Sequence, residues 1–378
     1  MRYYLIAGEA SGDLHGSNLI KALRRRDPGA EFRCWGGDLM EAAGATLVKH
    51  YKELAFMGFV EVIRNLPVIL RNLRMCKTDI LAYKPDALIL IDYPGFNLRI
   101  ARWAHAQGLR VIYYISPQVW AWKESRVNGI KTSVDKMLVI LPFEKDFYNK
   151  WGYGVEYVGH PLVEVVEAAQ RHPAALLSAK PIVALLPGSR AQEVALKLPV
   201  MLEVSRYFPD HQFIVAQAPS LDDAYYKPYI EAYPGVQLAQ GNTYGLLQQA
   251  RAALVTSGTA TLETALFGVP EVVCYKGARV SYEIAKRLIK VPYISLVNLI
   301  MDKPVVKELI QQDMNAENVR AELDKLLHDE AYRARIERDY ASLKQILQQG
   351  GDASANAAAS IDGFIAAGTA PAGIKGSE

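Results

Sequence analysis

Residues 3–13 read Tyr-Tyr-Leu-Ile-Ala-Gly-Glu-Ala-Ser-Gly-Asp, an apolar run that ends in a turn of small and acidic residues. A run that is apolar at nearly every position predicts a strand buried on both faces, as in a parallel sheet. The same order recurs at residues 182–190, Ile-Val-Ala-Leu-Leu-Pro-Gly-Ser-Arg, and a helical pattern follows each turn. Strands that alternate with helices in this way predict an α/β fold built from parallel sheets and crossover helices.

The alternation continues along most of the chain and is interrupted once. Gly159 and Pro161 end a strand, an Ala-rich helical stretch follows, and Lys180-Pro181 opens a new strand. We therefore expect two Rossmann-like lobes, with parallel sheets facing each other across a cleft. The predicted segments are residues 1–165, residues 166–345, a C-terminal helical segment at 346–367 and a disordered tail at 368–378. The predicted strands are residues 3–7, 32–35, 87–91, 110–114, 136–140, 155–158, 182–186, 212–216, 236–239, 252–255 and 271–275.

Length, charge and cysteine content narrow the class of protein. The chain has 378 residues, which is long for one core and favours two domains. A net charge of +3 gives no reason to expect nucleic acid as a partner. The cysteines, Cys34, Cys76 and Cys274, are far apart and suggest neither a disulfide framework nor a zinc site. We see no signal peptide and no apolar stretch long enough to span a membrane, and so expect a cytoplasmic protein.

In the first lobe, acidic residues follow two predicted strands. Ligands of open α/β sheets bind at the carboxyl ends of the strands, where Glu9 and Asp13 follow the first strand and Asp92 ends another. A carboxylate at that edge can take a proton from an attacking alcohol, provided that it lies within hydrogen-bond reach. The alternative is structural, with Ser11 or Asp13 capping a helix and Asp92 capping the turn at Pro94.

A loop with two tryptophans follows a further predicted strand of this lobe. Residues 116–122 read Ser-Pro-Gln-Val-Trp-Ala-Trp. Tryptophan rings stack on sugars or lipid chains, and they also fill interfaces between lobes. Both interpretations of Trp120 and Trp122 remain open from the sequence.

In the second lobe, two turns suit an anion. Residues 186–190, Leu-Pro-Gly-Ser-Arg, place an arginine with a planar fork of donors directly after a strand. Residues 256–263, Thr-Ser-Gly-Thr-Ala-Thr-Leu-Glu, place hydroxyls at the start of a helix, whose free N–H groups favour phosphate. Glu263 could accept both hydroxyls of a ribose, and so the turns together predict a nucleoside-diphosphate site. The chain contains no Asp-x-Asp pair to hold a diphosphate through a metal, and we predict that its chemistry is metal-independent.

Residues 51–77 combine apolar bulk with basic charge and carry a net +3. Such a segment can lie on anionic lipid, in which case its apolar members would contact acyl chains. The alternative is a pair of core-facing helices with solvated arginines. Pro67 disfavours one unbroken helix, so we expect two short ones. The candidate lipid-contacting residues are Phe56, Met57, Phe59, Ile69 and Leu70.

Taken together, these motifs resemble those of the lipid-A-disaccharide synthase family, from about residue 3 to about residue 345. The matching motifs are Gly8–Asp13, Ile91-Asp92 with Phe96-Asn97, Ser116–Trp122, Val158–Leu162, Leu186–Arg190, Ser257–Glu263, and Ile294–Asn298 with Lys307–Leu309. The resemblance implies a GT-B fold and an inverting transfer from UDP-2,3-diacylglucosamine to the 6-hydroxyl of 2,3-diacylglucosamine 1-phosphate. The products would be the β-1,6 lipid A disaccharide 1-phosphate and UDP, and no cofactor is implied.

The resemblance also implies roles for individual residues. Asp92 is the candidate base, with Glu9 as the competing base or as an acceptor-binding group. The candidate UDP-sugar residues are Gly188, Ser189, Arg190, Ser257, Gly258, Thr259, Glu263 and Asn298. The candidate acceptor or cleft residues are Ser11, Asp13, Asn97, Gln118 and Trp120. Residues 1–165 would then form the acceptor- and membrane-facing lobe, and residues 166–345 the UDP-sugar lobe.

The family acts at the inner face of the cytoplasmic membrane, which implies a peripheral location there. Family members can dimerise by exchanging C-terminal segments, so residues 346–367 would pack either on the first lobe or on a partner chain. Two other functions remain open from the residues. One is a related GT-B enzyme, such as a UDP-GlcNAc epimerase or a peptidoglycan glycosyltransferase. The other is a nucleotide-gated binding protein at the membrane surface.

Overall fold

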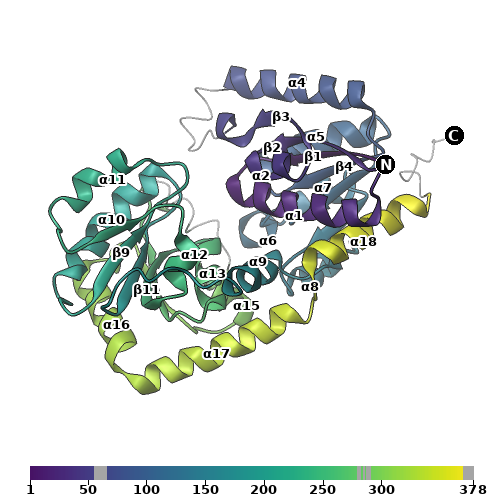
Figure 1. Ribbon diagram of the computed structural model, residues 1–378. Coiled ribbons are helices and arrows are strands. Elements are labelled where there is room, and N and C mark those ends of the chain that lie inside the picture. The colour runs from purple at the N-terminus through teal and green to yellow at the C-terminus, as the bar shows by residue number, and fades with distance from the viewer. Residues whose placement is uncertain (55–65, 279–281, 284–285, 287–290, 369–378) are drawn as a thin grey trace. The chain divides into compact units, whose positions relative to one another are not determined.

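The computed structural model describes all residues except 55–65, 279–281, 284–285, 287–290 and 369–378. The chain divides into two compact units (Figure 1). Unit 1 consists of Met1–Pro161 with Gln349–Glu378, and unit 2 of Leu162–Gln348. Each unit is an α/β unit with its own parallel sheet, which confirms the predicted fold class.

The sheet of unit 1 has the strand order β3-β2-β1-β4-β5-β6-β7 and is parallel throughout. Its central strands are fully buried, because β1 and β4 consist almost entirely of apolar residues. Register pairs Ala7 with Ile91, so the chain leaves β1 and β4 at the same edge of the sheet. The strands are β1 (Arg2–Ala7), β2 (Glu31–Gly36), β3 (Thr46–His50), β4 (Ala87–Ile91), β5 (Val111–Tyr114), β6 (Lys136–Val139) and β7 (Glu156–Tyr157).

The helices of unit 1 follow its strands, and a helix from the end of the chain joins them. That helix, α18 (Ala353–Ala366), packs against α1 (Ala10–Arg26), and the Tyr3 hydroxyl donates to Asp362 Oδ1 over 3.2 Å. The other helices are α2 (Asp38–Ala42), η1 (Tyr51–Glu53), α4 (Leu66–Tyr83), α5 (Pro94–Ala106), α6 (Val119–Trp122), α7 (Arg126–Lys131) and α8 (Glu144–Lys150).

The sheet of unit 2 has the strand order β10-β9-β8-β11-β12-β13 and is also parallel. Register pairs Leu186 with Val255, so the turns after β8 and β11 leave the same edge side by side. The strands are β8 (Ile182–Leu186), β9 (Gln212–Ala216), β10 (Gln237–Ala239), β11 (Ala250–Thr256), β12 (Glu271–Tyr275) and β13 (Lys307–Ile310). The helices are α9 (Pro161–Gln170), α10 (Ala191–Ser205), α11 (Asp223–Ile230), α12 (Thr243–Leu247), α13 (Thr259–Leu266), α15 (Leu296–Met301), α16 (Ala316–His328) and α17 (Glu330–Gln348).

Two strands, β3 and β13, are missing from the sequence prediction. Both lie at an edge of their sheet, and both are short and carry charged residues. An edge strand needs little apolar side chain, and charge there protects the open edge, so the apolar-run criterion passes over it.

Pro67 lies in the first turn of α4, where a missing N–H leaves no intrahelical bond unmade. The second of the two predicted short helices is therefore wrong in length, since α4 runs for 18 residues and includes Pro67, and residues 55–65, where the first was expected, lie outside the described part. Among the described helices, we find none whose length and hydropathy would let it cross a membrane.

Candidate active site

Asp92 and Glu9 come from adjacent strands at the carboxyl edge of the sheet in unit 1. Asp92 directly follows β4, and Glu9 stands two residues beyond β1 as the N-cap of α1. Burial, and after it the negative charge of Glu9, raise the pKa of Asp92 from its usual value to about 7, although the hydrogen bond from the Tyr93 N–H lowers it. The two predicted candidates for the base therefore interact, and the carboxyl of Asp92 titrates near neutral pH, as a general base should.

The backbone around Asp92 is held in an unfavourable conformation. Asp92, Tyr93 and Ile115 have φ angles of 44°, 49° and 65°, in the left-handed region that non-glycine residues seldom adopt. Ile115 directly follows β5, the neighbour of β4 in the sheet. Strain of this kind tends to gather at functional sites, where the surrounding structure holds it in place.

Asn97 supplies part of that restraint. Its Nδ2 donates to the carbonyl of Asp92 over 2.8 Å, and the Tyr113 hydroxyl donates to the same oxygen over 2.6 Å. The Asn97 amide also reaches the carbonyls of Ile6 and Ile91 at 3.3 and 3.2 Å, so it ties β1 to β4. The side chain is fully buried. In this structure, Asn97 positions the Asp92 turn.

Gly8 is required by the packing of the same turn. A Cβ placed on Gly8 would lie 2.3 Å from Cγ of Tyr93, so any larger residue would displace the Tyr93 ring. The glycine of the Gly8–Asp13 motif therefore lets the left-handed residue after Asp92 pack directly on the turn after β1.

Asp13 lies in α1 and caps a different helix. Its carboxylate accepts hydrogen bonds from the N–H groups of Gly37, Leu39 and Met40 at 2.8, 3.1 and 3.0 Å, which fixes the start of α2. The side chain is 3% exposed, whereas the neighbouring Ser11 is half-buried. Asp13 thus holds the turn after β2 in place at the same edge of the sheet.

The Ser116–Trp122 loop is anchored by a carboxylate that the sequence interpretation did not single out. The Trp120 Nε1 donates to Glu144 Oε1 over 3.3 Å, and the N–H of Leu141 donates to Glu144 Oε2 over 2.9 Å. Trp120 is 7% exposed, while Gln118 and Trp122 lie at the surface. Burial raises the pKa of Glu144 to about 7. Glu144 opens α8 like a capping residue, and a buried partner for the tryptophan is visible only in three dimensions.

In unit 2, the turn after β8 is a tight structure built around Gly188. This glycine has a φ of 131°, and a Cβ on it would lie 2.4 Å from Glu193 Oε2. The Ser189 N–H donates to Glu193 Oε2 over 3.0 Å, and the Arg190 guanidinium lies 3.6 Å from Glu193 Oε1. Arg190 is the N-cap of α10 and keeps 42% of its side chain exposed. The turn therefore presents an arginine beside the free N–H groups of a helix.

The second turn of unit 2 lies on the adjacent strand. Ser257 donates its hydroxyl hydrogen to the carbonyl of Ile294 over 2.8 Å, which links the turn to the segment that enters α15. Gly258 and Thr259 are exposed at the start of α13. Exposed N–H groups and a hydroxyl at this helix start suit a phosphate.

Glu263 and Asn298 lie near that turn and differ in what they offer a ligand. Glu263 lies on the second turn of α13, and burial raises the pKa of its carboxyl to about 7. Asn298 is 1% exposed, and its amide bonds to both backbone groups of Val306 at 3.0 Å and to Glu308 at 2.9 Å. The Asn298 side chain therefore braces β13 against α15.

A further residue absent from the sequence interpretation is Lys197 in α10, which is 2% exposed. It lies between the buried apolar residues Val194 and Met201 along the helix. The sequence signal that could have identified Lys197 is a lysine on the apolar face of a predicted helix.

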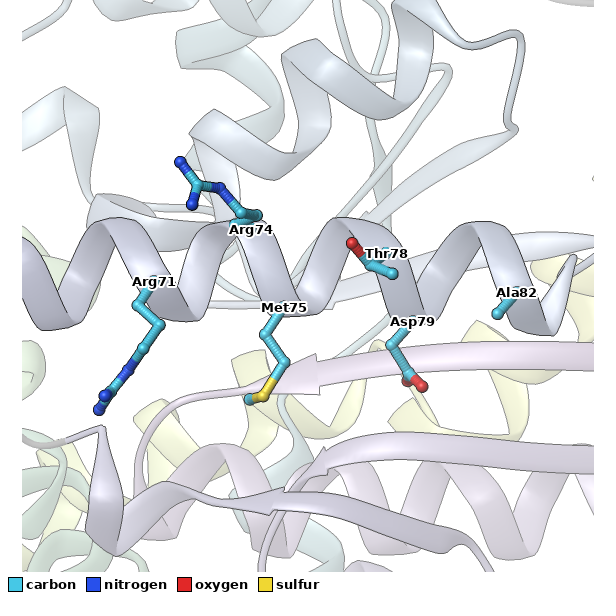
Figure 2. Close-up of a pocket in the computed structure, with 6 residues that line it drawn as sticks. All are labelled: Arg71, Arg74, Met75, Thr78, Asp79 and Ala82. Carbon is cyan, nitrogen blue, oxygen red and sulfur yellow. The ribbon is translucent and has the colours of Figure 1, made fainter.

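The helix α4 carries exposed leucines and arginines, and a hollow of about 430 Å³ beside it is lined by Arg71, Arg74, Met75, Thr78, Asp79 and Ala82. Arg71, Met75 and Asp79 project on one side of the helix, and Arg74 on the other (Figure 2). Leu70 is 56% exposed, whereas Ile69 is half-buried against the core of unit 1. Leu66 and Leu81 are also exposed. The other predicted lipid-contacting residues, Phe56, Met57 and Phe59, lie outside the described residues.

The chain has two α/β units, each with a parallel sheet and with candidate site residues at the carboxyl edge of that sheet. This arrangement defines the class of protein as GT-B. Solved structures of this class are similar over nearly the whole chain. The glycotransferase of kitacinnamycin matches with a TM-score of 0.66 and 15% identity, covering 96% of this chain and 99% of that one. UDP-GlcNAc 2-epimerase from Neisseria meningitidis, bound to UDP-GlcNAc, matches with a TM-score of 0.57 and 13% identity, covering 98% and 100%. At these identities, the similarity shows the fold alone.

The sequence comparisons are more specific. The model of the family described as lipid-A-disaccharide synthetase matches residues 3–362. Lipid-A-disaccharide synthase of Syntrophus aciditrophicus is 43% identical over 354 residues, covering 91% of this chain and 92% of that protein. The enzyme of Geobacter sulfurreducens is 41% identical over 360 residues, covering 93% and 94%. The chain belongs to the lipid-A-disaccharide synthase family of glycosyltransferases.

Proposed function

We propose that this glycosyltransferase forms the lipid A disaccharide in lipopolysaccharide biosynthesis, with Asp92 as the general base. It would transfer the sugar of UDP-2,3-diacylglucosamine to the 6-hydroxyl of 2,3-diacylglucosamine 1-phosphate, giving a β-1,6 linkage and UDP. The family supports the reaction, and one observation supports the base. Asp92 follows the central strand β4, and its pKa is raised to about 7 by burial and by Glu9.

The chemistry requires one proton transfer and one displacement. The acceptor hydroxyl gives its proton to the Asp92 carboxylate as its oxygen attacks the anomeric carbon. The bond from that carbon to the UDP oxygen breaks, and the diphosphate leaves with the electron pair. A carboxylate with a pKa near neutrality is basic enough to help, and about half of it is ionised at pH 7. Asn97 and Tyr113 would hold its backbone still.

The donor would be held by the two adjacent turns of unit 2. Arg190 would contact the diphosphate, together with the N–H groups at the starts of α10 and α13. Thr259, exposed at the second turn, would add a hydroxyl. Glu263 lies deeper on α13, where it would accept from the ribose. Charge on the leaving UDP would thus be neutralised by protein groups.

The acceptor and donor both carry acyl chains, and the exposed face of α4 would meet the inner face of the cytoplasmic membrane. Leu66, Leu70 and Leu81 supply apolar area there, with Arg71 and Arg74 beside them for anionic head groups. The predicted homodimer is part of the same proposal. In a dimer that exchanges C-terminal segments, the contacts that α18 makes with α1 would form between chains.

A turnover assay of purified protein with both acylated substrates tests the proposal, with wild type beside Asp92→Asn. We expect disaccharide and UDP from the wild type, and a turnover lower by roughly 10²–10⁴-fold in the variant. The affinity for UDP should be unchanged, because the variant leaves unit 2 intact. A wild-type protein that instead converts soluble UDP-GlcNAc without lipid would indicate an epimerase-like enzyme. UDP binding without turnover of any sugar would indicate a binding protein.

A further inference from the structure

Lys197 is a buried cation at the carboxyl edge of the sheet in unit 2. It stands in the second turn of α10, is 2% exposed, and donates a hydrogen bond from Nζ to Thr256 Oγ1. Its ammonium also lies 5.9 Å from the centre of the Tyr275 ring. Thr256 ends β11 and Tyr275 ends β12, so the charge sits beneath the ends of two neighbouring strands.

A buried ammonium is costly unless an opposite charge accompanies it. In the part of the chain that the structure describes, no carboxylate lies within 4.0 Å of Lys197 Nζ. Glu193 is the acid that favours its charged form, but Glu193 also accepts from the Ser189 N–H at 3.0 Å and lies 3.6 Å from Arg190. Lys197 therefore shares one carboxylate with a second cation.

Arg190 and Lys197 repel each other. Burial lowers the pKa of Lys197, Glu193 and Cys274 oppose that effect, and the charge of Arg190 lowers the pKa further. Arg190 is the N-cap of α10 and Lys197 lies on its second turn, and the repulsion between the two charges falls when an anion binds beside them. The turn Ser257–Thr259, next to Thr256, is the place where the phosphates of the donor would lie.

We infer that Lys197 is a positioning residue of the donor site, which acts through the Thr256 hydroxyl and through its charge on the diphosphate. This inference rests on the proposed donor site. The Thr256 oxygen accepts from the ammonium, so its own hydrogen has to point elsewhere and is available to an anion or to a neighbouring acceptor. Lys197 thus adds positive charge from the buried side of the turn, while Arg190 adds it from the exposed side.

Calorimetric binding of UDP, UMP and uridine to wild type and Lys197→Met tests this role. We expect UDP affinity to fall by about tenfold in the variant, the lower end for a charge-assisted hydrogen bond because the lysine acts through a hydroxyl. Uridine affinity should be unchanged. Thermal stability should not fall, since methionine fits apolar surroundings without a desolvation cost. Lys180→Met, at an exposed lysine of unit 2, is the matched control and should leave all three affinities unchanged.

The pH dependence separates this role from a structural one. The charged groups around Lys197 are Arg190 and Glu193, and the titratable groups Cys274 and Tyr275 also face it, with pKa values that burial raises. Because Lys197 carries its positive charge only when protonated, wild-type UDP affinity should fall at alkaline pH, and Lys197→Met should lack that fall. Thr256→Val should weaken UDP binding, and its effect should not add to that of Lys197→Met in the double variant.

The outcomes distinguish two failures. A Lys197→Met protein that folds and binds UDP as tightly as the wild type, with the same alkaline limb, overturns the role of Lys197 and leaves the donor site standing. A wild-type protein that binds no UDP overturns the donor site itself, and the inference with it. Equal losses for UDP and uridine, with lower thermal stability, would show that the lysine serves only the fold.

Discussion

Replacing Glu9 by Gln separates the two candidates for the base. Asp92 and Glu9 sit at the same sheet edge, and the charge of Glu9 helps to raise the pKa of Asp92 from 3.8 to about 7. Gln keeps the size and shape of Glu and one acceptor oxygen, but it carries no charge. If Asp92 is the base, the variant still has its base and loses only the like charge beside it.

The size of the effect follows from the order of the causes. Burial is the larger cause of the raised pKa of Asp92, and Glu9 is the second. We therefore expect the Glu9 charge to account for a minor part, about one pH unit. A lower pKa means that Asp92 stays ionised to lower pH. Below the wild-type midpoint the variant should be faster, by up to roughly tenfold, and its plateau slightly lower because a weaker base helps less.

The assay is kcat/KM for disaccharide formation as a function of pH, which reports groups of the free enzyme. Glu31→Gln is the control, an exposed glutamate at the opposite end of a neighbouring strand. The wild-type acid limb should have its midpoint near pH 7, and Glu9→Gln should shift it to lower pH. Collapse of turnover in Glu9→Gln at every pH, with Asp92→Asn still active, would refute this reasoning and make Glu9 the base.

Three further predictions concern the donor, the membrane and metals. Arg190→Ala should weaken UDP binding by about 1.5–3 kcal/mol in calorimetry, the range for a hydrogen bond to a charged group, and Arg338→Ala, at an exposed arginine of unit 2, should not. Leu66→Ser with Leu70→Ser and Leu81→Ser should reduce flotation with anionic vesicles, whereas Leu176→Ser, at a leucine 80% exposed elsewhere, should leave it unchanged; equal flotation of both would remove α4 from the membrane surface. Turnover should survive a chelator, and loss that magnesium restores would show that a metal is required.

Most of the fold could be predicted from apolar runs because the central strands of both sheets are buried on both faces. Ala87–Ile91 and Glu271–Tyr275 were located to the residue. The strands that escaped, Thr46–His50 and Lys307–Ile310, need only one neighbour each and tolerate charge. Their sequences contain little that distinguishes them from loops, and only the completed sheet assigns them.

The sequence predicted where the turns of the site lie, but not which groups each polar side chain contacts. Strand ends predicted that Glu9, Asp92 and Arg190 would lie at sheet edges, because that depends on the chain path alone. Whether a polar side chain faces a ligand or the backbone depends on groups distant in sequence. Asp13 is held by the N–H groups of residues 37–40, and Asn298 by Val306 and Glu308.

The same reasoning explains why the buried ionisable groups were missed. Glu144 looks like a helix-capping acid in the sequence, and Lys197 looks like one polar residue on an apolar face. The role of each depends on a partner on another element. Glu144 accepts from Trp120, and Lys197 donates to Thr256. A charge that the fold keeps buried at a cost, beside a turn that suits a ligand, is explained better by what it does for the ligand than by stability. Lys197 is therefore the residue at which loss of function and gain of stability should be sought together, whereas Glu144 also satisfies the Trp120 and Leu141 N–H groups and its loss should destabilise the fold.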